Sequence, residues 1–238
     1  HILGLFRLWW IPEGMEASAG AYVSYDHEAM VGIVLLEAQR AGAVVIGEDL
    51  GTVEPWVRGY LNDRGIMGTS VLWFEKEGSG WPLWPDHYRR SCLAAVTTHD
   101  LPPTLGYLEG VHTELRNRLG LLVEDLDQVL DADRVERERM VSRLKEGGFI
   151  HDEEPSEDQL VLAFHAYLAA SPALLLAVSL VDAVGEKAPQ NLPGTSSDEY
   201  PNWCIPLHGS DGEEQYVEDL ASSEKLHGFL SNVNRYIR

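Results

Sequence analysis

Short apolar segments that alternate with helical segments constrain the fold of this chain more than any other feature. β-branched and aromatic residues favour strands at 44–46, 68–75 and 92–100, and a fourth apolar segment at 173–182 follows a predicted helix. Because a crossover between parallel strands must cover a face of the sheet, this alternation predicts an α/β fold with a parallel sheet. Half of a (β/α)8 barrel and a doubly wound sheet are both compatible with it.

Residues that begin and end helices mark the segments between these strands. We expect one helix over 26–42, which ends at Gly42, and another over 52–65. In the second helix Thr52 is a candidate N-cap and Pro55 falls in the first turn.

A charged helical segment separates the third and fourth predicted strands. Because its span from 104 to 155 is too long for an ordinary loop, we expect a helical insertion at about 105–155. The insertion would belong to a single domain that covers 1–238. Ser156 and Gln159 predict a capping box at the start of the next helix.

Composition narrows the class of partner. With 18 basic and 38 acidic residues the formal net charge is −20, which disfavours nucleic acid and anionic membranes and favours neutral ligands. Cys92 and Cys204 give no disulfide framework and no metal-ligand spacing, so we expect no metal site and a cytoplasmic location. No apolar run reaches the roughly 20 residues that span a bilayer. The first residues do not resemble a signal peptide.

Polar side chains follow the predicted strands at the ends where α/β proteins bind ligands. They are Glu48, Asp49, Glu75, His99, Asp100 and Asp182.

Glu48 and Asp100 are the leading candidates for acid and base chemistry. Cleavage of a glycosidic bond needs a proton for the leaving oxygen and negative charge that faces an oxocarbenium-like carbon. For Asp49 we favour helix capping, whereas Gly47 would let a ligand approach Glu48 closely. The alternative for His99 and Asp100 is a turn in which the aspartate bonds to nearby backbone amides.

Seven tryptophans are a high number for this length. Trp81 and Trp84 lie in a Pro-rich loop, where stacking on sugar rings and local packing are equally plausible. Trp9, Trp10 and Trp56 are expected in the core.

Five segments resemble the 4-alpha-glucanotransferases, the amylomaltases or disproportionating enzymes of the α-amylase superfamily. They occur in family order over nearly the whole chain, and the Leu-Pro-Pro variant after His99-Asp100 is similar to actinobacterial members. The segments are HILGLFRLWWIPEG, VIGEDLG, GTSVLWFE, TTHDLPPT and GEKAPQNLPGTSSDEYPNW. The resemblance implies the C-terminal half of a TIM (β/α)8 barrel, with strands five to eight.

The resemblance also implies roles for individual residues. Glu48 would be the general acid/base, and Asp100 would hold sugar hydroxyls and stabilise the transition state. His99 would bond a hydroxyl of the sugar before the scissile bond, and Phe74 and Asn191 would line the cleft. The substrates would be maltooligosaccharides and other α-glucans, and no cofactor is expected.

The chain departs from the family pattern in two places. The family nucleophile is an Asp in an Arg-x-Asp-His motif, and the chain starts at the histidine of that motif, His1. We therefore expect the isolated chain to be inactive without the N-terminal remainder of the enzyme. Cys204 occupies a position where the family would have an arginine.

Three functional hypotheses follow. The first is retaining transfer of α-1,4-glucan segments by double displacement. The second is a non-catalytic α-glucan-binding fragment that needs its N-terminal half, and the third is an α-glucan hydrolase. If the chain alone were active, Glu75 or Asp182 would be the candidate nucleophile.

Overall fold

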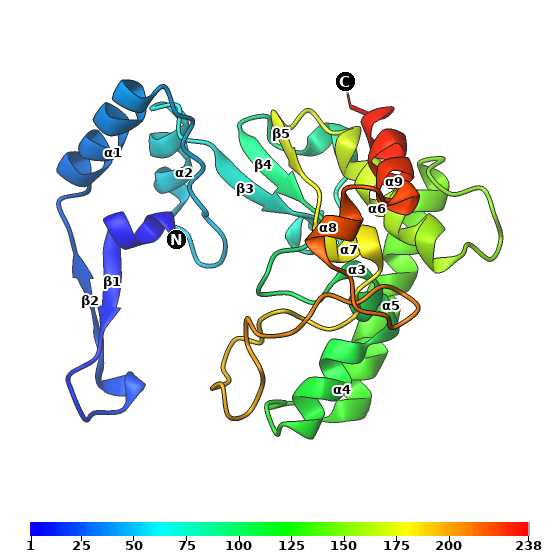
Figure 1. Cartoon of the computed structure of the whole chain (residues 1–238). Helices are drawn as coiled ribbons and strands as arrows, with labels where there is room; N and C mark the ends of the chain where they lie inside the picture. The colour runs from blue at the N-terminus through cyan, green and yellow to red at the C-terminus, as the bar shows by residue number, and fades with distance from the viewer. Residues whose placement is uncertain (238) are drawn as a thin grey trace. The chain divides into compact units, whose positions relative to one another are not determined.

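The computed structural model describes residues 1–237, and the chain divides into two compact units (Figure 1). The first unit comprises His1–Ser70 with Ser91–Leu93. The second comprises Val71–Arg90 and the residues from Ala94 onward.

The first unit contains a β-hairpin and two helices. The hairpin pairs its strands antiparallel, with Arg7 opposite Ser24 and Trp10 opposite Ala21. A short 3-10 helix, η1 (Ile2–Leu5), precedes it. The elements are β1 (Arg7–Trp10), β2 (Ala21–Ser24), α1 (His27–Ala41) and α2 (Pro55–Asn62).

A small apolar cluster holds this unit together. Its buried members are Phe6, Val31, Val57, Leu61 and Ile66.

The two helices of this unit begin in different ways. The Asp26 carboxylate accepts a hydrogen bond from the Ala29 amide at 3.1 Å, and Gly42 ends α1 with a φ of +62°, as the sequence predicted. In contrast, α2 starts after Glu54 without a side-chain cap, so Thr52 is not its N-cap. Pro55 occupies the first turn as expected.

Three strands form the second sheet, in the order β3-β4-β5. They are β3 (Gly68–Val71), β4 (Cys92–Ala95) and β5 (Leu175–Ala177). The expected strand at 44–46 is wrong, because only an isolated parallel bridge joins Ile46 to Met67.

The three strands are shorter than predicted, and two of them are followed by short helices. Val71, Leu72 and Trp73 are all buried, and Leu72–Phe74 turns into a 3-10 helix, η3. After β5 the chain turns into a short helix, so Asp182 lies on a helix and not at a strand end.

Helices make up most of the second unit. The segment between 104 and 155 is helical over three elements, in agreement with its sequence pattern. The helices are α3 (Thr104–Glu109), α4 (Val111–Arg118), α5 (Leu126–Glu146), α6 (Glu157–Ala169), α7 (Leu180–Val184), α8 (Val217–Leu220) and α9 (Glu224–Asn234).

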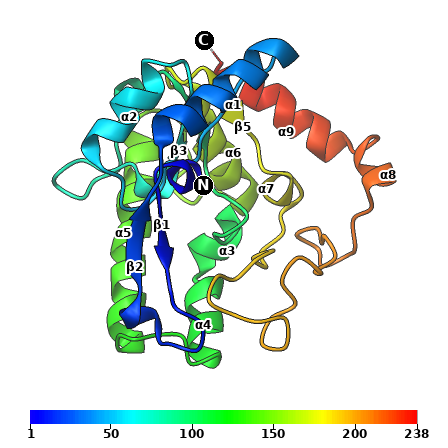
Figure 2. The same cartoon turned by 90° about the vertical axis from the view of Figure 1, so that its left-hand side faces the viewer.

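The central helix of this unit is α6. It contacts α3, α5 and α9, and Figures 1 and 2 both show α9 beside it. Phe164, Tyr167 and Leu168 are fully buried, and the Tyr167 hydroxyl donates to the Leu83 carbonyl oxygen at 2.6 Å. Burial raises the pKa of Tyr167.

The expected burial of three tryptophans is wrong. Trp9, Trp10 and Trp56 are 45%, 58% and 49% exposed, respectively. The hairpin strands are exposed along almost their whole length, so alternation along a strand does not bury one face here. No helix within residues 1–237 is long and apolar enough to cross a membrane.

The capping box of α6 provides a test of local stability. The Ser156 hydroxyl oxygen accepts from the Gln159 amide at 3.3 Å, and the Ser156 amide donates to the Gln159 side chain at 2.7 Å. We predict that Ser156→Ala lowers the free energy of unfolding by about 1 kcal/mol, because one helix-end amide loses its partner. Urea titration followed by circular dichroism measures this loss.

Ser231→Ala is the matched control, since Ser231 lies inside α9 and is exposed. There alanine raises helix propensity, so stability should stay the same or rise slightly. Equal destabilisation by both variants would contradict a specific contribution from the cap.

Candidate active site

The turn after β4 presents His99 and Asp100. The Thr97 hydroxyl donates to the Pro102 carbonyl oxygen at 2.8 Å, which closes the turn across its base. The Asp100 amide donates to the Thr98 hydroxyl oxygen at 3.3 Å. Both side chains at the tip are accessible, with exposures of 63% for His99 and 47% for Asp100.

The Asp100 carboxylate is oriented by two side chains. Its Oδ1 accepts a hydrogen bond from Asn191 Nδ2 at 2.6 Å, although 91 residues separate the two in sequence. Its Oδ2 lies 3.6 Å from His99 Nε2. The structure therefore brings together three of the residues predicted for the site. The hydrogen bond that fixes the carboxylate comes from a side chain far along the chain.

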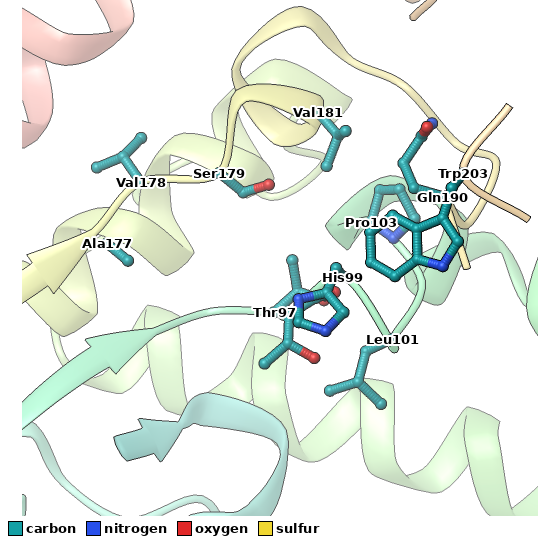
Figure 3. Close-up of a pocket in the computed structure, with 11 residues that line it drawn as sticks. Thr97, His99, Leu101, Pro103, Ala177, Val178, Ser179, Val181, Gln190 and Trp203 are labelled. Atoms are coloured by element: carbon teal, nitrogen blue, oxygen red, sulfur yellow. The ribbon is translucent and has the colours of Figure 1, made fainter. Parts of the chain in front are cut away.

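A pocket of about 420 Å³ opens beside this cluster (Figure 3). Residues after β4 and residues after β5 line it together, as expected where parallel strands end at one edge of a sheet. Trp203 lies against the His99 ring, with centroids 5.2 Å apart and planes inclined by 46°. The lining includes Thr97, His99, Leu101, Pro103, Ser179, Val181, Gln190 and Trp203.

The loop that carries Gln190 and Asn191 is fixed by a buried carboxylate. Glu186 accepts hydrogen bonds from the amides of Lys187, Ala188 and His208 at 2.7, 2.8 and 2.9 Å. Gly106 of α3 packs so closely against this loop that an added Cβ would lie 2.1 Å from the Lys187 carbonyl oxygen. A glycine is therefore required at this position in the helix.

An apolar cluster anchors the far end of the same loop. Leu192 and Tyr200 pack with Leu115 of α4 and are buried. The Asn202 side chain accepts from the Leu192 amide at 2.8 Å and donates to the Thr195 hydroxyl oxygen at 2.9 Å. These contacts hold the backbone that leads into Trp203.

Asp182 joins the segment after β5 to the helix after the His99-Asp100 turn. It is buried, and its two oxygens accept from the Thr104 amide at 2.6 Å and the Thr104 hydroxyl at 2.8 Å. Thr104 is the first residue of α3, whose amide has no partner within its own helix. Asp182 is therefore a structural residue that holds the end of this turn.

A buried histidine lies on the other side of Asp182. His165 Nε2 is 3.6 Å from an Asp182 oxygen, and His165 Nδ1 lies 2.9 Å from the Val161 carbonyl oxygen. Burial lowers the pKa of His165 and raises the pKa of Asp182, since each charged form loses its hydration. No sequence pattern predicted this pair.

Glu48 lies in the first unit, after the bridge at Ile46. Its side chain is 46% exposed, and its carbonyl oxygen accepts from the Ile2 amide at 2.9 Å. An added Cβ on Gly47 would lie within 2.9 Å of the Ile2 side chain. Packing against Ile2 therefore explains the glycine, and access of a ligand to Glu48 stays a prediction.

Asp49 does not cap a helix as expected. Its buried carboxylate accepts from the Thr69 amide at 2.9 Å and forms an ion pair with Arg58 Nε at 3.2 Å. Asp49 thus connects the segment after Glu48 to β3. Of the two neighbouring acids, Glu48 is the accessible one.

The remaining candidates lie outside the pocket. Phe74 ends η3 and is 55% exposed, and Glu75 follows it, half-buried.

The Arg143 guanidinium carbon lies 5.4 Å from the Trp81 ring centroid and 4.0 Å from that of Trp84, which favours local packing for both tryptophans. Within residues 1–237, no three His, Cys, Asp or Glu side chains are grouped so that they could hold a metal ion.

The Asp100 carboxylate and the Trp203 ring lie by a pocket at the carboxyl ends of strands, which is where α/β enzymes bind their ligands. The model of one protein family, described as 4-alpha-glucanotransferase, matches residues 1–211. The chain belongs to this family, and the resemblance found in its motifs is confirmed.

Individual relatives agree with this assignment. The 4-alpha-glucanotransferases of Mycobacterium tuberculosis and Mycobacterium bovis are 53% identical over 230 residues, which cover 94% of this chain and 32% of each relative. The Haemophilus influenzae 4-alpha-glucanotransferase is 35% identical over 243 residues, with 99% of this chain and 34% of the relative covered. The chain thus spans about a third of the length of these relatives.

Solved structures show the same fold. The crystal structure of amylomaltase from Corynebacterium glutamicum superposes with a TM-score of 0.92 at 45% identity and covers 98% of this chain and 34% of its own. An amylomaltase from Streptococcus agalactiae in complex with acarbose reaches a TM-score of 0.61 at 18% identity, covering 98% of this chain and 39% of its own. The chain therefore has an α/β fold that matches amylomaltase.

The contact between Asp182 and Thr104 can be tested by a double-mutant cycle. We predict that Asp182→Ala lowers the free energy of unfolding by about 2–4 kcal/mol, since it leaves the buried Thr104 amide without a partner. Thr104→Val should lower the free energy of unfolding by about 1–2 kcal/mol, because it removes one of the two hydrogen bonds to Asp182. Urea titration of the single and double variants gives the coupling energy.

The two effects should be non-additive by at least about 0.5 kcal/mol, as expected for side chains in direct contact. Asp219→Ala, a change in the short helix α8, is the control for loss of a negative charge. Additive effects of the Asp182 and Thr104 changes would rule out the proposed coupling.

Proposed function

We propose that this chain carries part of the active site of a 4-alpha-glucanotransferase that transfers α-1,4-glucan segments between maltooligosaccharides with retention of configuration. The observation that carries this proposal is the cluster of Asp100, His99 and Asn191 beside a pocket at the ends of β4 and β5. Within the proposal, the chain is the C-terminal half of a (β/α)8 barrel, with strands five to eight. Residues 1–238 then form one domain with a helical insertion at about 105–155.

Glu48 is the proposed general acid/base. It first protonates the oxygen of the leaving sugar while an aspartate nucleophile forms a glucosyl ester. It then takes a proton from the 4-hydroxyl of an incoming sugar, which attacks the ester and forms a new α-1,4 bond. Retaining enzymes place these two carboxyl groups about 5 Å apart.

The proposed nucleophile is an aspartate directly before His1 in a longer polypeptide. The hydrogen bond between the Ile2 amide and the Glu48 carbonyl oxygen supports this placement, because it brings the first residues beside Glu48. His1 Nε2 also lies 2.8 Å from the Leu50 carbonyl oxygen. In this proposal the N-terminal remainder of the enzyme supplies the nucleophile, and the isolated chain transfers no glucan.

Asp100 is proposed to stabilise the positive charge that develops at the anomeric carbon and to accept sugar hydroxyls. Asn191 already donates a hydrogen bond to Asp100 Oδ1. Asp100 Oδ2 is therefore the oxygen that would bind a ligand, together with His99. Both groups can then bond hydroxyls of one glucose ring. Phe74 and Asn191 are proposed to contribute further contacts along the cleft.

The exposed apolar side chains of the first unit support a role for the N-terminal remainder as a partner. Trp10, Ile33 and Val44 are 58%, 61% and 64% exposed, whereas such residues are usually buried in a complete domain. We propose a cytoplasmic enzyme, because two cysteines, Cys92 and Cys204, give no disulfide framework.

A disproportionation assay on maltotriose tests the proposed reaction. We expect glucose and longer maltooligosaccharides from a polypeptide that joins this chain to its N-terminal remainder, and neither from the chain alone. Glu48→Gln should lower the rate by about 10²–10⁴-fold, since the variant loses the group that donates and accepts the proton. Chromatography of the products measures both outcomes.

Glu54→Gln is the matched control, because Glu54 lies in the same segment and is 45% exposed. It should leave the rate unchanged within about twofold, since a surface ion pair contributes little. Full activity of Glu48→Gln would contradict its role. Products that are only shorter than the substrate would identify a hydrolase, and glucan binding without turnover would identify a non-catalytic fragment.

A further inference from the structure

Trp203 has an unusual backbone conformation for a large side chain. Its φ is +63°, and it is the single non-glycine residue with a positive φ within residues 1–237. In this left-handed region Cβ comes too close to the following carbonyl oxygen, so residues other than glycine rarely adopt it. A tryptophan kept here needs a physical reason.

The surrounding backbone holds this conformation firmly. The Trp203 amide donates to the Gln190 carbonyl oxygen at 2.9 Å, and the Cys204 amide donates to the Pro201 carbonyl oxygen at 3.1 Å. On the amino side, the Asn202 side chain is fixed by the loop that carries Leu192. Strain of this kind persists only where neighbouring contacts over-determine it, and it is concentrated at ligand sites.

Packing among the described residues does not explain the strain. The Trp203 side chain is 63% exposed, although it is the largest apolar side chain of its loop. Instead, its ring forms a wall of the pocket and faces the His99 ring (Figure 3). The left-handed backbone thus presents an aromatic surface to the pocket and to solvent.

The pocket beside this surface suits a small neutral ligand. Its volume of about 420 Å³ falls in the common range for small-molecule sites, and apolar side chains such as Val181 and Pro103 share its lining with Gln190. The Gln190 Nε2 atom is buried and has no hydrogen-bond partner among the described residues. An unsatisfied donor therefore lies in the pocket wall next to the strained residue.

We propose that Trp203 is a stacking platform that binds the apolar face of a glucose ring in this pocket, beside His99 and Asp100. This inference rests on the proposed function and names a binding residue that its reaction scheme does not use. The indole would contact the C–H face of the ring, while His99 and the Asp100 carboxylate bond its hydroxyls. Trp203 would then determine how tightly, and in which position, the glucan chain is held.

Three variants separate a binding role from a packing role. Trp203→Gly removes the ring and also relieves the strain, because glycine adopts a positive φ freely. Trp203→Phe keeps both an aromatic face and the strain. Tyr216→Ala is the control for loss of an exposed aromatic ring, since Tyr216 is 57% exposed and does not line the pocket.

Binding is measured by isothermal titration calorimetry with maltotetraose. The protein is the full-length polypeptide with Glu48→Gln, which blocks turnover. We expect Trp203→Gly to raise Kd by about tenfold or more while Tm stays the same or rises. Trp203→Phe should retain Kd within about threefold, and Tyr216→Ala should not change Kd. In the active enzyme, Trp203→Gly should raise KM more than it lowers kcat.

A fall in Tm with Kd unchanged would overturn the inference, as would a Trp203→Phe variant that binds no better than Trp203→Gly. The experiments distinguish failure of the proposed reaction from failure of the Trp203 platform. If the parent enzyme transfers glucan and Trp203→Gly binds normally, only the platform is refuted. If the parent transfers no glucan but maltotetraose binding depends on Trp203, the platform stands and the proposed function is refuted.

Discussion

The buried contact between Asp182 and Thr104 is the interaction on which the candidate site depends. Two oxygens of one carboxylate accept the amide and the hydroxyl of the first residue of α3, at 2.6 and 2.8 Å. Burial favours the neutral acid and raises the pKa of Asp182, whereas both bonds from Thr104 and the neighbouring His165 oppose that rise. Because Asp182 accepts both bonds from Thr104, this single side chain holds the segment after β5 against the turn after β4. The pocket lies between those two segments.

The groups that would meet a ligand are exposed, and exposed hydrogen bonds contribute little to stability by themselves. Asp100 and Asn191 therefore owe their geometry to the backbones that carry them. Asp182 holds one backbone, and Glu186 holds the other through three amides. The structural carboxylates of Asp182 and Glu186 are buried and accept several hydrogen bonds, while the exposed Asp100 carboxylate accepts one from Asn191 and has its other oxygen near His99. Carboxylates thus have two uses here. Buried ones hold backbone segments in place, and the exposed one of Asp100 is a candidate ligand-binding group.

Local patterns in the sequence were sufficient where the interaction itself is local. The capping box of Ser156 and the left-handed end of α1 at Gly42 each involve residues within one helix turn, and both were predicted. The bond from Asn191 to Asp100 was not predictable from spacing, although the family resemblance named both residues. Asp182 was placed at a strand end and Trp203 was not singled out, because the contacts of both come from residues distant in sequence. Gly47 illustrates the same point, since the atoms that require the glycine belong to Ile2.

The charge of the chain bears on the kind of substrate that the site can hold. A net charge of −20 repels anions, so affinity must come from neutral contacts such as hydroxyl hydrogen bonds and stacking on an aromatic face. Neutral glucans meet this condition in the ground state. In the proposed reaction, the positive charge that develops at the anomeric carbon would be attracted by the Asp100 carboxylate, which Asn191 orients. Under the proposed function, the exposed ring of Trp203 would therefore bind the neutral glucan, and the Asp100 carboxylate would stabilise the charge of the transition state.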